Sequence, residues 1–267
     1  MNLHYRKEGN GRPLVIIHGL YGSSDNWMII SARLSERYTV YSVDLRNHGR
    51  SPHDPVHTYE AMKEDIALFF DQHRIGPAVI MGHSMGGKVA MLFAADYPEL
   101  VKKLIVVDIA PKDYLALDQD SQYHLHRSIL LAMMEVDFSV VKSRRDVEDS
   151  LAEKIDSERI RQFLLKNVAS DRQAHRLKWR LNAEALYNNL EEIVEGGNYK
   201  RFEDRVPITG YPVVFIRGLE SPYIQDNDIP LLKRIYPDAN IVDIPNAGHW
   251  LHAEQPELFL EAVLQCC

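Results

Sequence analysis

Short apolar segments alternate with helical patterns along most of this chain, and this alternation restricts the possible folds more than any other feature. Several of these segments are hydrophobic at consecutive positions, as expected for parallel strands buried on both faces. Segments of 3.6-residue periodicity predict helices that cover the sheet. The sequence therefore predicts an α/β fold whose mostly parallel sheet carries helices on both faces. The expected strands span residues 13–19, 39–45, 78–83, 103–110, 213–218 and 240–245, with a short edge strand at 3–7.

One long stretch, residues 112–205, interrupts the alternation with helical patterns and no convincing strand. Because the chain then returns to the same sheet, we expect a helical cap, or lid, inserted after the strand that ends at Asp108. Such a cap would lie over the strand ends, where open α/β sheets bind ligands. The core would comprise 1–111 and 206–267, and a separate helical domain is the alternative. The helical patterns cover 128–134, 147–155, 158–168 and 182–194, before a Gly196-Gly197 turn signal.

The charge and the chain ends exclude several classes of protein. A net charge of -7 gives no basic surface for nucleic acid. The first residues lack the pattern of a signal peptide, and no apolar run approaches the ~18 residues of a membrane span. The two cysteines, Cys266 and Cys267, are adjacent and poorly placed to cross-link a fold. We expect a cytoplasmic protein, as a monomer or a homodimer, with no nucleic-acid partner and no membrane span.

Residues Gly82 to Gly86 match the motif G-x-S-x-G between a strand and a helix-like run. This context predicts that Ser84 is a nucleophile on a sharp turn, with glycines on both sides because the turn crowds its neighbours. The start of the following helix presents free N–H groups, so the backbone N–H of Met85 is an expected oxyanion donor. A second donor is expected from HGLYG at 18–22, at the N–H of Leu20.

A serine nucleophile needs a neutral imidazole to take its proton. His249 is the best candidate because it follows the last expected strand and completes the order serine, acid, histidine. His48 precedes the nucleophile. Five other histidines belong to turns or to pairs that lack the carboxylates of a zinc site, so no metal is expected. These are His18, His83, the pair His124 and His126, and His252.

The histidine needs a carboxylate at the end of a strand to orient it. Asp108 ends an apolar strand, where a carboxylate is costly to bury without a partner. Glu220 is the first alternative, because it follows a later strand at the usual position of the acid. Asp226 and Asp44 are further alternatives, although Asp44 more plausibly fixes its own loop.

Read in order, these segments resemble the YbfF-type bacterial carboxylesterases of the α/β-hydrolase superfamily. The resemblance rests on HGLYGSSDNW, VDLRNHGRSPHDP, GHSMGGKVAM, VVDIAPKDY, SPYI and AGHWLHAEQP, and it spans nearly the whole expected core. It implies an esterase that needs no cofactor and acts on acyl esters, with acyl thioesters such as acyl-CoA as a second substrate class. By matched position it implies Ser84 as nucleophile, His249 as base and Asp108 as acid, with the non-acidic SPYI where other hydrolases carry aspartate.

The expected reaction is a two-step acyl transfer. A carbon-carbon bond hydrolase, a peptidase or a perhydrolase could use the same residues, and a non-catalytic small-molecule binder is a rival of another class. A basic cluster in the cap could meet coenzyme A phosphates, although such a cluster is usually a solvated helix face. Its members are Arg172, Arg176, Lys178 and Arg180; the candidates for an acyl pocket are Met133, Met134, Phe138, Trp179 and Leu186.

Overall fold

The computed structural model describes residues 1–115, 122–171 and 174–266, and it contains a seven-stranded sheet in the order β1-β3-β2-β4-β5-β8-β9. Strand β1 runs antiparallel to β3 at one edge, and the other pairs are parallel. Every strand expected in the core is present. The strands are β1 Tyr5–Glu8, β2 Arg12–Ile17, β3 Tyr38–Val43, β4 Ala78–His83, β5 Val101–Val107, β8 Val213–Gly218 and β9 Asn240–Ile244.

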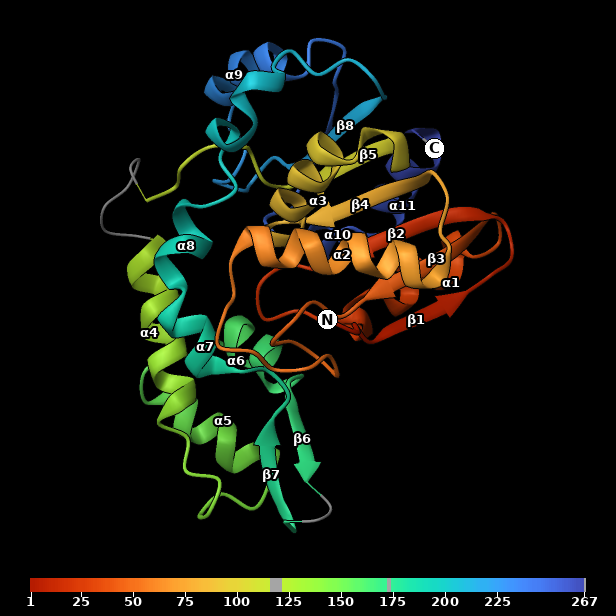
Figure 1. Ribbon diagram of the computed structural model, residues 1–267. Coiled ribbons are helices and arrows are strands. Elements are labelled where there is room, and N and C mark those ends of the chain that lie inside the picture. Colours follow the sequence, from red (N-terminus) through yellow and green to blue (C-terminus); the bar gives the residue numbers. More distant parts are fainter. Residues whose placement is uncertain (116–121, 172–173, 267) are drawn as a thin grey trace.

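Helices cover both faces of this sheet (Figure 1). Successive side chains of a strand point to opposite faces, so Leu14 and Ile16 of β2 enter one hydrophobic core while Val15 and Ile17 enter the other. The first core also contains residues of α1 (Met28–Leu34) and α11 (Pro256–Cys266). The second contains residues of α2 (Tyr59–His73), α3 (Met85–Asp96) and α9 (Ile229–Ile235). The predicted α/β fold with helices on both faces is therefore confirmed.

Residues 112–205, here called the cap segment, extend from one end of the sheet (Figure 1). Its helices are α4 Gln122–Met134, α5 Arg144–Ala152, α6 Glu158–Leu165, α7 Ala183–Asn188 and α8 Leu190–Glu195. The cap segment ends with a 3-10 helix, Tyr199–Arg205. The rest of the chain also contains α10 (Leu251–Glu254) and short 3-10 helices at Ser24–Trp27, Pro98–Leu100 and Asp226–Asp228.

The expectation that the cap segment lacks strands is wrong. Strands β6 (Val168–Asp171) and β7 (Arg176–Trp179) pair with each other as an antiparallel two-stranded sheet. Each has four residues, of which Val168 alone is buried, so neither forms the apolar run by which the core strands are recognised.

The helix expected over 182–194 is divided in two. Helix α7 ends at Asn188 and α8 begins at Leu190. Between them, the side-chain amide of Asn189 donates hydrogen bonds to the carbonyl oxygens of Ala185 and Pro55. An asparagine that bonds local backbone in this way competes with helix continuation, which accounts for the break.

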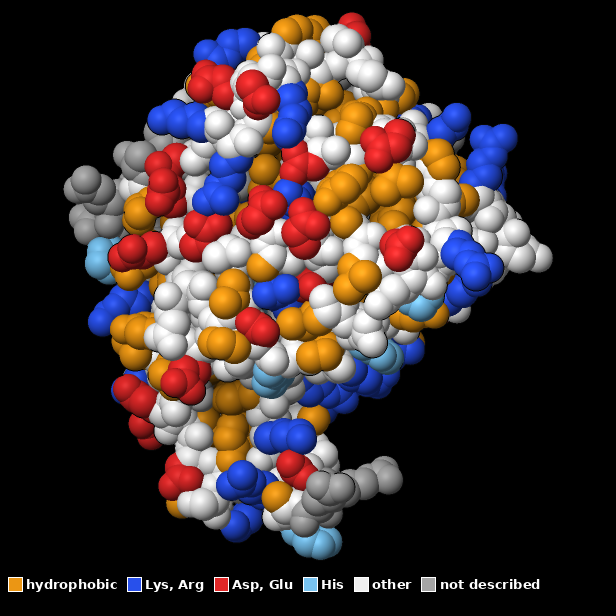
Figure 2. Space-filling model, viewed as in Figure 1, with side chains coloured by type: hydrophobic (Ala, Val, Ile, Leu, Met, Phe, Trp, Pro, Cys, Tyr) orange, Lys and Arg blue, Asp and Glu red, His pale blue; other side chains and the backbone are white. Residues whose placement is uncertain are grey.

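The surface carries no large field of one charge on the face seen in Figure 2, where acidic and basic side chains are interspersed. Among the described residues, no helix combines the length and apolar character needed to cross a membrane. Cys266 is a free, partly exposed thiol, and Cys267 lies outside the described residues.

Candidate active site

Ser84 occupies a sharp turn between β4 and α3, with φ 54° and ψ −121°. This left-handed φ is unfavourable for a residue with a side chain and indicates a turn held by its surroundings. A Cβ atom on Gly82 would lie 2.2 Å from the carbonyl oxygen of Gly86, and one on Gly86 would lie 2.4 Å from that of His18. The glycines therefore allow three backbone segments to pack closely enough to form the turn.

His249 lies on the loop after β9 and reaches Ser84. Its Nε2 atom is 2.9 Å from the Ser84 hydroxyl oxygen, and its Nδ1 atom is 2.7 Å from Asp108 Oδ2. An unbroken chain of hydrogen bonds thus joins serine, histidine and aspartate from the ends of three strands. With the carboxylate accepting from Nδ1–H, Nε2 is left with a lone pair toward the serine.

Asp108 follows β5 and is completely buried. Besides His249, its carboxylate accepts hydrogen bonds from the Gly218 N–H at 3.2 Å and from the Ser221 hydroxyl. A buried carboxylate is stable only when its oxygens are paired, and three donors serve that purpose here. Sequence reasoning missed Ser221 as one of these donors, although its position in SPYI, where other hydrolases carry aspartate, was a signal.

The alternative acids occupy other environments. Glu220 is exposed on the turn after β8, and Asp226 is an exposed partner of Arg217. Asp44 is buried, but it accepts the backbone N–H groups of Ser24 and Arg50, so it fixes its own loop as expected. Among the described residues, Asp108 is the acid within hydrogen-bonding distance of the His249 ring.

The side chains of Tyr223 and His83 both contact His249. The Tyr223 ring stacks on the imidazole, with centroids 3.9 Å apart and planes at 23°. His83 Nε2 lies 2.8 Å from the His249 carbonyl oxygen, and burial holds the pKa of His83 well below its usual value. A neutral His83 that donates from Nε2 fits this contact, so it anchors the backbone of the loop.

Glu254 in α10 holds the same loop by its backbone. Its carboxylate accepts the N–H groups of Gly248 at 2.5 Å and Trp250 at 3.2 Å, the two neighbours of His249. It also pairs with Arg159 of α6, whose guanidinium lies 4.6 Å from the Trp250 ring. Although burial alone would raise the pKa of Glu254, these donors hold it below its usual value.

The loop HGLYG after β2 is fixed by two buried histidines. His18 Nδ1 lies 2.8 Å from the Gly19 carbonyl oxygen, while its Nε2 accepts the Leu45 N–H at 3.0 Å. His48 Nε2 accepts the N–H of Tyr21 at 3.2 Å. Burial lowers the pKa of both imidazoles, which suits their role as acceptors.

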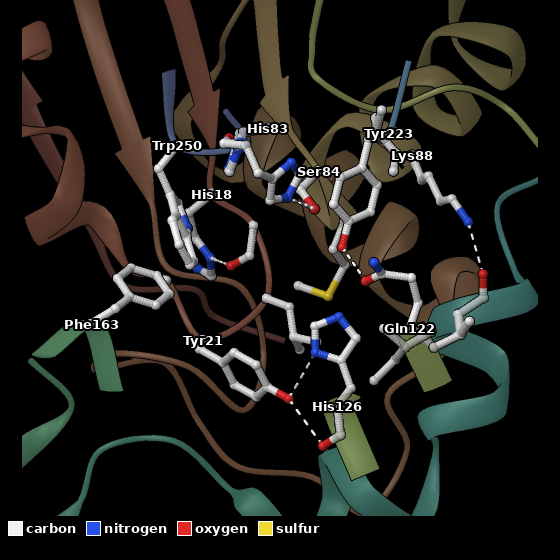
Figure 3. Close-up of a pocket in the computed structure, with 18 of the residues that line it drawn as sticks. His18, Tyr21, His83, Ser84, Lys88, Gln122, His126, Phe163, Tyr223 and Trp250 are labelled. Atoms are coloured by element: carbon white, nitrogen blue, oxygen red, sulfur yellow. Dashed lines mark hydrogen bonds between the residues drawn. The ribbon is translucent and has the colours of Figure 1, made fainter. Parts of the chain in front are cut away.

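A cavity of about 200 Å³ lies against the serine. Ser84 and His249 line it, and so do Leu20 and Met85, whose N–H groups were the expected oxyanion donors. Figure 3 shows Ser84 and His83 on one side of this cavity, with Tyr21 and His126 across from them. The cap segment contributes six apolar side chains and three that carry polar groups, namely Leu125, Ile129, Ile160, Phe163, Ile193 and Val194 with Tyr114, Gln122 and His126.

The cap residues expected to line an acyl pocket lie elsewhere. Met133 and Leu186 are buried inside the cap segment, and Met134 is exposed. Trp179 packs edge-to-face on Phe138 and donates its indole N–H to the Met133 carbonyl oxygen. Apolar character alone could not separate them from the lining residues, because the cavity ends about one turn of α4 before Met133.

The other residues considered from sequence are not part of the hydrogen-bonded chain of Ser84, His249 and Asp108. His124 is exposed, and His252, which lines the cavity, stacks on Trp27 with centroids 4.3 Å apart. In the basic cluster, Lys178 pairs with Asp171 and Arg180 with Asp25, and Arg172 lies outside the described residues. The described part of the chain holds no group of three or more His, Cys, Asp or Glu side chains arranged to bind a metal ion.

Lys88 is a buried lysine in α3, one turn after Ser84, and it also lines the cavity. Its ammonium donates to the carbonyl oxygens of Val194 at 3.2 Å and Gly196 at 2.6 Å, at the end of α8. The ring of Tyr114 lies 4.9 Å from Nζ. Burial lowers the pKa of Lys88 to about 7. This contact, which sequence reasoning missed, ties the core to the cap segment.

Comparison with known proteins gives a consistent result. The family described as alpha/beta hydrolase fold matches residues 12–256. The chain is 38% identical to the sn-1-specific diacylglycerol lipase ABHD11 of Danio rerio, covering 96% of this chain and 78% of that protein. It is 33% identical to the esterase YbfF of Escherichia coli, covering 97% and 94%.

A solved structure also resembles this one along its whole length. A marine microorganism esterase superposes with a TM-score of 0.90 at 42% identity, over 99% of each chain. The similarity of this chain to the marine esterase and to YbfF confirms its resemblance to the bacterial esterases, which the motifs had indicated.

Proposed function

Since this chain belongs to the alpha/beta hydrolase fold family, we propose that it is a serine carboxylesterase that cleaves acyl esters through an acyl-enzyme intermediate. Relatives named as esterases and lipases support hydrolase activity of the esterase or lipase kind. The observation that carries the finer proposal is the pair of hydrogen bonds from Ser84 to His249 and from His249 to Asp108.

In the first step, the Ser84 hydroxyl attacks the ester carbonyl carbon. Its proton passes over the 2.9 Å contact to Nε2 of His249, which becomes an imidazolium. Asp108 stabilises this cation through Nδ1–H and holds the tautomer that leaves Nε2 free to accept. The imidazolium then gives the proton to the leaving alcohol, and the acyl group remains on Ser84.

The carbonyl oxygen becomes negative in this step. We assign its stabilisation to the N–H groups of Leu20 and Met85, whose residues line the cavity with Ser84. Met85 is the first residue of α3, where the helix dipole also favours negative charge. Loss of one such donor typically costs about a hundredfold in rate.

Water completes the cycle in the second step. His249 takes a proton from water, whose oxygen attacks the acyl carbon, and the proton then returns to Ser84 as the acid leaves. No residue of this scheme requires a cofactor. An apolar cavity of about 200 Å³ suits a short or medium acyl chain, and we assign the role of lid to the cap segment.

Acyl thioesters would pass through the same acyl-enzyme. A dedicated coenzyme A site is less well supported, because Arg176, Lys178 and Arg180 do not line the cavity and two of them are paired. We therefore assign thioesters as secondary substrates.

The test is a panel of p-nitrophenyl esters and acyl-CoAs of increasing chain length, with Ser84→Ala as the blank. Ester turnover that disappears in Ser84→Ala is the expected result. Absence of ester turnover in the wild-type protein, together with no labelling by a fluorophosphonate, would favour a non-catalytic binding protein.

A further inference from the structure

Helix α4 presents one face to the cavity. Gln122, Leu125, His126 and Ile129 recur at the helical spacing of three and four residues, and all four line the cavity. Among the lining residues of α4, Gln122 and His126 are the polar ones. Figure 3 shows both side chains directed toward the cavity interior.

The Gln122 side chain is held beside the base. The Tyr223 hydroxyl donates to Gln122 Oε1 at 2.8 Å, and the same Tyr223 ring stacks on His249. This contact engages the amide oxygen and leaves the amide nitrogen with two hydrogens to donate.

The His126 ring contacts Tyr21 of the HGLYG loop, which also carries Leu20, one of the expected oxyanion donors. Its Nδ1 atom is 3.2 Å from the Tyr21 hydroxyl, which also lies 3.5 Å from the His126 carbonyl oxygen. When Tyr21 donates to that carbonyl, Nδ1–H donates to Tyr21 and Nε2 keeps a lone pair. Burial lowers the pKa of His126 to about 4, so the ring is neutral near pH 7.

We propose that Gln122 and His126 form a subsite for a hydroxyl group of the substrate, which makes hydroxylated esters the preferred substrate class. This inference rests on the proposed function. A hydroxyl oxygen accepts from the Gln122 amide while its hydrogen is donated to His126 Nε2, so one group satisfies both side chains. A methyl group of similar size would make no hydrogen bond with the Gln122 amide N–H or with His126 Nε2 in a largely apolar cavity, and unmet polar atoms are costly.

The experiment uses two pairs of esters in which a hydroxyl replaces a methyl. In one pair, 2-hydroxyethyl butyrate and propyl butyrate, the change is in the alcohol. In the other, ethyl 3-hydroxybutyrate and ethyl 3-methylbutyrate, it is in the acyl group. The subsite predicts that kcat/KM favours the hydroxylated member of at least one pair by about tenfold or more.

The matched variants are Gln122→Met and His126→Phe, with Leu125→Met on the same helix as the control. Each polar variant should reduce the ratio of kcat/KM for the hydroxylated ester to kcat/KM for the methyl ester by about tenfold, while the control keeps the wild-type ratio. Titration with a fluorophosphonate counts the competent sites of every variant, so misfolding is not mistaken for lost recognition.

Two outcomes are distinguishable. Equal turnover of both members of each pair, or a preference that survives in both polar variants, would overturn the subsite and leave the esterase proposal intact. Failure of the wild-type protein to cleave any of the four esters above the Ser84→Ala blank would overturn both.

Discussion

Replacement of Asp108 by asparagine is the most informative single change in the proposed site. Asparagine keeps the size of the side chain, and an amide oxygen in the place of Oδ1 still accepts from the Gly218 N–H, while the Ser221 hydroxyl would have to accept from the amide nitrogen instead of donating. Its amide nitrogen would then face His249 Nδ1 across the present 2.7 Å contact. An N–H donor there stabilises the tautomer that carries its hydrogen on Nε2, which points a hydrogen rather than a lone pair at Ser84.

The expected loss follows from that wrong tautomer. The equivalent change in a serine protease triad lowers kcat by about 10⁴-fold, or about 5.5 kcal/mol of transition-state stabilisation. We expect a loss of this order for Asp108→Asn, measured as kcat for a p-nitrophenyl ester. Glu220→Gln is the matched control because Glu220 is exposed, and it should stay within about twofold of wild type.

Two results would refute this reasoning. Asp108→Asn that retains more than about a tenth of wild-type kcat would show that Asp108 does not set the tautomer. A large loss in Glu220→Gln would move the acid to the turn after β8. Urea unfolding of both variants distinguishes a catalytic loss from a loss of fold.

Three further changes test the surroundings of the site. Glu254→Ala removes the acceptor of the Gly248 and Trp250 N–H groups, so kcat should fall about tenfold with little change in KM. Glu254→Gln keeps an acceptor and should retain most activity. Equal losses of kcat in the two variants would contradict this positioning role. Lys88 has a folded-state pKa of about 7, below its usual 10.5, so from pH 7 to 10.5 the unfolded chain binds the proton that the folded chain has lost, and wild-type stability rises with pH. Relative to Lys88→Met, the unfolding free energy of wild type should therefore increase by up to about 5 kcal/mol across this window in urea titrations, and a constant difference would refute the shift. Gly86→Ala would put a Cβ atom 2.4 Å from a carbonyl oxygen and should cost about 3 kcal/mol in the same titrations, whereas an unchanged midpoint would contradict the close packing of the turn.

The core of the fold was predictable because its signals are local. Consecutive apolar residues identify the parallel strands, and the glycines at 82 and 86 identify the turn that carries Ser84. The order of these elements also brings His249 to the correct edge of the sheet. The choice among acids was less certain, because Asp44, Asp108 and Glu220 all follow strands and only burial and pairing separate them.

The cavity was less predictable because it depends on how the cap segment lies over the sheet. Met133 lies on the same helix as His126, yet only His126 reaches the cavity. The buried Lys88 and Tyr223 likewise take their positions from contacts with residues more than 100 positions away, Gly196 and Gln122 respectively. No short window of sequence contains that information.

The most direct test of the central claim is the mass of the protein trapped during turnover. Wild type mixed with a p-nitrophenyl ester and quenched in acid should show a burst of nitrophenol, gain the mass of one acyl group, and carry that group on the peptide containing Ser84. Hydrolysis without a burst or an adduct, or an acyl group on another residue, would contradict the acyl-enzyme mechanism.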